Sequence, residues 1–96
     1  MKKQFGLNTY GAPIDYCLYK LEQLSMKPLE LHPMYKQLCD ILTALDFDEP
    51  IPFNAKKICY DSLLAITKWC FNIDKECALK WINSTVNEWL VNITKD

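Results

Sequence analysis

The sequence contains no arginine, so all 11 of its basic residues are lysine. Arginine supplies the planar guanidinium fork that reads guanine and holds phosphate or carboxylate through two parallel hydrogen bonds. Its absence, together with a net charge of −1, argues against a nucleic-acid-binding protein. The many Lys, Asn and Ile residues agree with an AT-rich coding sequence, and this composition suits a microbial or phage source.

Glycine and histidine are also scarce. Two glycines in 96 residues are too few for a Gly-rich phosphate loop or for a β-sandwich with many tight turns. The single histidine, His32, has no neighbour at metal-ligand spacing, so we expect no metal site. No pattern selects a nucleophile, a base and an acid that would act together, and we therefore expect neither enzyme activity nor a cofactor.

The five cysteines contain no CxxC pair, which excludes a thioredoxin-type redox site and a zinc ribbon. An odd number also prevents complete pairing in disulfides. Free cysteine is one of the most buried residue types, so we expect these side chains to act as small core residues in a reducing compartment. They are Cys17, Cys39, Cys59, Cys70 and Cys77.

Long hydrophobic runs are missing. No run approaches the ~18 apolar residues that a membrane-spanning helix needs. The basic start, Met1–Gly6, is not followed by the apolar stretch of a secretory signal. The sequence therefore predicts no membrane span and a cytoplasmic location.

Half of the residues are hydrophobic and 12% are aromatic, which fits one globular domain with its own core. Apolar residues recur at helical spacing, and no strand pattern competes with them. We expect an all-α, single-domain bundle of about four helices. Residues 1–12 are predicted to be an irregular N-terminal arm and residues 13–96 the helical bundle domain. The expected helices cover 13–26, 33–45, 55–72 and 75–94.

Prolines and caps set these limits. Pro13 and Pro33 suit the first helical position, where the missing N–H costs nothing, and Pro28 ends the first helix. Asn54 and Asp74 are suitable N-caps for the last two helices.

The helix over 55–72 is apolar on most sides, which predicts a central position. Its second stripe, formed by Tyr60, Leu64 and Phe71, needs a cover from the arm or from another chain. The last helix has the clearest apolar arc, and we expect this arc to face the core. Its members are Leu79, Ile82, Val86, Trp89, Leu90 and Ile93.

Several large apolar residues lie outside the expected core stripes. Tyrosine and methionine are favoured at protein interfaces, because they combine a large apolar area with a polar or adaptable tip. The alternative is that the aromatic residues are covered internally or scattered singly on the surface. The predicted partner-binding residues are Tyr16, Tyr19 and Met26 of the first helix, Phe47 and Phe53 of the proline-rich acidic loop, and Trp81 of the last helix.

Three short strings resemble fragments of acyl-CoA-binding proteins, which are helical bundles of similar length. The interval from Trp69 to Ala78 is shorter than the pattern of that family, and prolines interrupt the connection before residue 55, so we do not assign the chain to it. The strings are Tyr35-Lys36-Gln37, Lys68-Trp69 and Lys75-Glu76-Cys77-Ala78-Leu79-Lys80.

These features predict a small cytosolic module that binds another protein and acts sterically, as an inhibitor, immunity protein, chaperone or adaptor. One alternative is a homodimer closed by the stripe of Tyr60, Leu64 and Phe71. Another is a carrier that holds an apolar small ligand between its helices.

Overall fold

The computed structural model describes residues 11–94, which form four α-helices and one short 3₁₀-helix. Within this range there is no strand, which confirms the predicted all-α class. Residues 1–10, and with them most of the predicted arm, lie outside the described residues. The elements are α2 (Gly11–Ser25), η1 (Leu29–Leu31), α3 (Tyr35–Asp46), α4 (Ala55–Phe71) and α5 (Lys75–Thr94).

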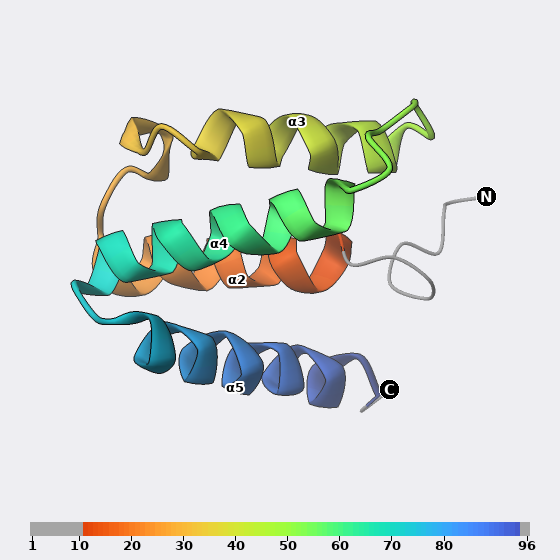
Figure 1. Cartoon of the computed structure of the whole chain (residues 1–96). Helices are drawn as coiled ribbons and strands as arrows, with labels where there is room; N and C mark the ends of the chain where they lie inside the picture. The colour runs from red at the N-terminus through yellow and green to blue at the C-terminus, as the bar shows by residue number, and fades with distance from the viewer. Residues whose placement is uncertain (1–10, 95–96) are drawn as a thin grey trace.

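The helices form three layers (Figure 1). The helices α2 and α4 lie side by side and run in the same direction, with α3 on one side of this pair and α5 on the other. Both outer helices run against the direction of the middle pair. Because α4 contacts α2, α3 and α5, the predicted central position of the helix over 55–72 is confirmed.

The helix limits follow the prolines and caps with shifts of one or two residues. The helix α2 is already formed at Gly11, so Pro13 lies in its first turn rather than at its start. The helix α3 begins at Tyr35, two residues after the predicted start, because the backbone N–H of Met34 donates to Nδ1 of His32 at 3.1 Å and closes a turn there. The N-cap prediction is confirmed for Asp74, whose carboxylate accepts the backbone N–H of Cys77 at 2.9 Å.

The other predicted cap, Asn54, precedes α4 as expected, but its side chain makes no capping hydrogen bond.

The shortage of glycine has a visible consequence at the helix ends. The helices α2, α3 and α4 are each followed within two residues by a left-handed residue that is not glycine, with φ values of 61° at Met26, 58° at Asp48 and 56° at Asn72. Aspartate and asparagine adopt this conformation readily. A methionine in the same conformation costs about 1–2 kcal/mol, because its Cβ crowds the backbone.

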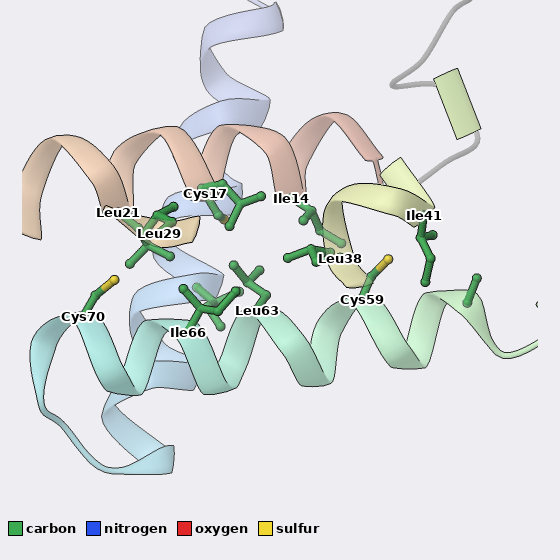
Figure 2. Packing of buried hydrophobic residues seen from close by; sticks show 13 residues of the cluster. Ile14, Cys17, Leu21, Leu29, Leu38, Ile41, Cys59, Leu63, Ile66 and Cys70 are labelled. Carbon is green, nitrogen blue, oxygen red and sulfur yellow. The ribbon is translucent and has the colours of Figure 1, made fainter. Parts of the chain in front are cut away.

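The core lies between α2 and α4 and extends to the two outer helices (Figure 2). Figure 2 shows Cys17 and Leu21 of α2 pointing toward Leu63 and Ile66 of α4. Leu29 of η1 joins them, so the short segment between α2 and α3 supplies a buried residue. The whole cluster is Ile14, Cys17, Leu18, Leu21, Leu29, Leu38, Ile41, Ala55, Cys59, Leu63, Ile66, Cys70 and Ile82.

All five cysteines are free, and three of them are buried, as the sequence predicts for small core residues. Burial raises the pKa of Cys17 to about 12 and that of Cys59 to about 11. These thiols therefore stay neutral and unreactive at neutral pH. Cys39 is half-buried and Cys77 is exposed.

The prediction for the core face of α5 is wrong in part. Leu79, Leu90 and Ile93 are between 42% and 50% exposed, whereas the buried residues of this helix are Ala78, Ile82 and Thr85. Small side chains allow two helices to approach closely. The buried face of α5 is therefore rotated away from the predicted arc, and of the predicted residues only Ile82 is fully buried.

On α2, Leu24 follows the helical spacing of the buried residues Leu18 and Leu21 but is itself exposed. In contrast, the second stripe of α4 is covered more than expected. Tyr60, Leu64 and Phe71 are half-buried and pack against the core. Among the described helices, none is long and apolar enough to cross a bilayer.

Candidate protein-binding surface

Tyr16 forms hydrogen bonds between α2 and α5 at the surface of the bundle. This side chain is half-buried, and its hydroxyl donates to Oε2 of Glu88 at 3.0 Å and accepts from the Asn92 amide at 3.4 Å. Lys20 adds a 3.5 Å ion pair to the same glutamate. Tyr16 therefore joins α2 to α5, and its role in partner binding stays a prediction.

Trp81 is also engaged within the fold. It packs against the core, and its ring meets that of Phe71 edge to face, with centroids 5.2 Å apart and planes at 65°. This geometry is the favourable one for two aromatic rings. The indole is half-buried, and this contact joins α4 to α5.

Tyr19 of α2 and Met26, which directly follows this helix, are both exposed. Met26 is 83% exposed and also holds the left-handed backbone conformation described above. Neither the exposure nor the left-handed backbone of Met26 stabilises the folded chain. This side chain therefore lies on the surface and is not part of the core.

The loop between α3 and α4, Phe47–Asn54, displays two phenylalanines. Phe47 is 67% exposed, and Phe53 is fully exposed with a relative accessible surface of 103%. Exposed aromatic side chains are a common feature of protein-binding surfaces. The structure thus supports the predicted exposure of both residues.

The same loop is held firmly. Pro50 and Pro52 fix two of its φ angles. The backbone N–H of Glu49 donates to the carbonyl of Ala44 at 2.8 Å, and that of Ala55 donates to the carbonyl of Pro52 at 3.0 Å. Because the loop is fixed at both ends, the exposed Phe53 sits on a pre-organised segment.

An open groove of about 440 Å³ lies beside this loop. Its lining is mainly apolar, and it includes both loop prolines. The loop therefore offers a projecting aromatic ring next to a hollow, which are the two shapes that a protein partner can match. The groove is lined by Gln37, Asp40, Ile41, Ala44, Pro50, Ile51, Pro52 and Ile58.

A second groove runs between α2 and α3. It consists of hollows of about 250 and 200 Å³ that share Asp15 in their lining, and we call it the α2–α3 groove. This groove cannot be predicted from the sequence, because its walls come from two helices that only the fold brings together. Its lining is Asp15, Leu18, Tyr19, Glu22, Leu29, Tyr35, Cys39, Leu42, Thr43 and Asp46.

The titratable residues in and near this groove have structural partners. A hydrogen bond with the Cys39 thiol is the main cause that raises the pKa of Tyr35 to about 12, and burial adds to it. Burial also raises the pKa of Asp15, and the nearby charge of Asp46 adds to this effect. Both carboxylates line the groove, so it carries negative charge in a partly desolvated place.

His32 has a structural role. Its ring meets Trp69 edge to face with centroids 5.4 Å apart, and burial lowers its pKa. Nζ of Lys27 lies 4.8 Å from the centroid of the same indole and donates to the Trp69 carbonyl at 2.9 Å. Within residues 11–94, no group of three or more His, Cys, Asp or Glu side chains is placed to hold a metal ion.

Comparison with known proteins leaves the site to be interpreted from its own geometry. No family model matches the chain, and neither the curated proteins nor the solved structures contain a match.

Proposed function

We propose that the protein is a protein-binding module that acts sterically and uses the Phe47–Asn54 loop as its anchor. One observation carries this proposal: Phe53 is fully exposed on a loop that prolines and backbone hydrogen bonds hold in place. Inhibitors, immunity proteins, chaperones and adaptors all work through such preformed contacts.

The energetic argument rests on pre-organisation. Burying one phenylalanine side chain contributes about 1.5–3 kcal/mol. A rigid loop delivers most of this free energy to binding, because it loses little conformational freedom when the partner docks. The neighbouring groove adds area for the rim of the contact.

We place this activity in the cytoplasm, where five unpaired cysteines stay reduced. All basic residues of the chain are lysine, and this composition supports a microbial or phage source.

A homodimer remains the second candidate, now with a different surface. Leu79, Leu90 and Ile93 form an exposed apolar edge of α5, whereas the stripe of α4 originally considered for this role is half-buried. Sedimentation over a dilution series tests this candidate, because an obligate dimer keeps its mass at low concentration. The carrier alternative has less support, because the hollows found between described residues are open surface grooves.

The proposed function is tested by capture with a loop variant. The tagged wild-type chain and the Phe47→Ala/Phe53→Ala variant are used to capture proteins from the native host's lysate, with quantification by mass spectrometry. We expect a stoichiometric partner that the wild type retains and the variant loses.

The matched control is Leu24→Ala, which removes an exposed apolar side chain from α2. It should retain the partner, and circular dichroism should show unchanged helix content in both variants. A partner that binds the loop variant as well as the wild type would contradict the proposal, as would a complete absence of stoichiometric partners.

A further inference from the structure

The lining of the α2–α3 groove combines an apolar floor with several carboxylates. Leu18 and Leu29 form buried parts of its lining, and Leu42 is half-buried. The exposed ring of Tyr19 on α2 faces the same hollow as the half-buried ring of Tyr35 on α3. This surface suits an apolar segment flanked by aromatic walls.

Carboxylates line both hollows of the groove. Asp15 lines both of them, and the charge of Asp46 in the smaller hollow raises the pKa of Asp15 beyond the effect of burial. In the larger hollow, the charges of Glu22 and of nearby Glu30 both raise the pKa of Tyr35. The groove lining contains three of these four acids and no basic residue.

The lysines of the surrounding elements are engaged elsewhere. Lys20 of α2 turns to Glu88 of α5, and Lys36 of α3 pairs with Asp40 at 3.1 Å. The ammonium group of Lys27, between α2 and η1, lies over the indole ring of Trp69. Within the described residues, the ion pairs found do not involve Asp15, Glu22 or Asp46, so the groove lacks the cations that its charge favours.

The spacing of the acids restricts what fits. Asp15 and Glu22 are seven residues apart on α2, which is about 10.5 Å along the helix axis. A partner helix that lies along the groove has the same rise per residue. Its basic side chains meet Asp15 and Glu22 when they are also seven residues apart, and the residues three and four positions after the first one face the apolar floor.

We propose that the α2–α3 groove binds an amphipathic helix of a partner protein, with lysine or arginine residues seven positions apart and leucine-sized residues between them on the same face. Helix-in-groove binding of this kind combines apolar burial with charge complementarity that sets the register. The proposal concerns a surface other than the Phe47–Asn54 loop and does not depend on it.

The test uses the full chain and a synthetic helical peptide. The probe is a fluorescein-labelled, 16-residue Ala/Gln-based peptide with lysine at positions 4 and 11 and leucine at positions 7, 8 and 15. Anisotropy titration measures its affinity at low salt. A second peptide carries its lysines two positions later, which turns them to the opposite face of the helix.

We expect the first peptide to bind and the Asp15→Asn/Glu22→Gln/Asp46→Asn variant to lose at least about tenfold in affinity. The matched control, Glu49→Gln/Asp61→Asn/Glu76→Gln, removes the same net charge outside the groove and should change the affinity less than about twofold. Bound peptide should also slow alkylation of Cys39 in the groove without slowing that of exposed Cys77.

Equal losses in the two variants, or equal binding of the two peptides, would show attraction to overall charge and overturn the proposal. Self-association of the chain that the groove variant abolishes would assign the groove to a second copy and also overturn it. The Phe47→Ala/Phe53→Ala variant should bind the peptide normally, so a failure of this proposal is distinct from a failure of the loop proposal.

Discussion

The two outer helices pack against the same middle layer in different ways. The helix α3 inserts the large side chains of Leu38 and Ile41 into the core. The helix α5 buries the small residues Ala78 and Thr85 beside Ile82 and leaves Leu90 exposed. The difference shows that an apolar stripe on a helix does not by itself identify the contact face, because small residues outside the stripe can form part of that face.

The largest expected change in stability distinguishes the packing of α3 from that of α5. Leu38→Ala should reduce the free energy of unfolding by about 3 kcal/mol, because it leaves a cavity beneath α3. Leu90→Ala removes the same group from α5 and should cost only about 0.5 kcal/mol, because Leu90 is already 44% exposed in the folded chain. Urea unfolding measures both values, and similar losses would mean that α5 packs through its leucines after all.

A second substitution tests the close approach of α5 directly. Ala78→Leu should cost about 2 kcal/mol, because the added side chain has no space against the middle layer. The neighbouring exposed position provides the control, since Leu79→Ala should be nearly neutral. Thermal unfolding followed by circular dichroism distinguishes the two; a harmless Ala78→Leu would show that the contact is loose.

A substitution at the left-handed residue after α2 should raise the stability of the protein instead of lowering it. Met26→Gly is expected to stabilise the protein by about 1 kcal/mol, because glycine adopts the left-handed conformation without a Cβ clash. Asn72→Gly should change stability less, since asparagine already tolerates that conformation. If Met26→Gly destabilises instead, the exposed methionine has a structural role that its surroundings do not indicate.

The smallest effect concerns the turn before α3 and its pH dependence. Burial lowers the pKa of His32 below its usual 6.5, so the unfolded chain takes up this proton first as the pH falls. The stabilising contribution of neutral His32 is complete above about pH 6.5 and decreases as the pH falls through the folded-state pKa.

His32→Asn keeps a side chain that can accept the Met34 N–H without titrating. Urea midpoints at pH 7.5 and pH 5 should therefore fall less in this variant than in the wild type. Equal changes would assign the acid sensitivity to other groups.

The sequence was sufficient for the fold class, the central helix and the exposed phenylalanines. Helical periodicity marks a helix such as α4 reliably, and two prolines around Ile51 exclude a helix there. The partners of Tyr16 were not predictable, because Glu88 and Asn92 are more than 70 residues away in the chain. The α2–α3 groove was missed for the same reason, since Asp15 and Asp46 meet only after α2 and α3 pack.

The most direct measurement compares the two aromatic residues that the sequence treats alike and the structure separates. Once a partner is captured, its affinity is measured by calorimetry for the wild type, Phe53→Ala and Tyr16→Phe. Phe53→Ala should weaken binding by more than about tenfold, whereas Tyr16→Phe should leave it within about twofold. A partner that loses affinity with Tyr16→Phe and keeps it with Phe53→Ala would show that the binding surface is not the Phe47–Asn54 loop.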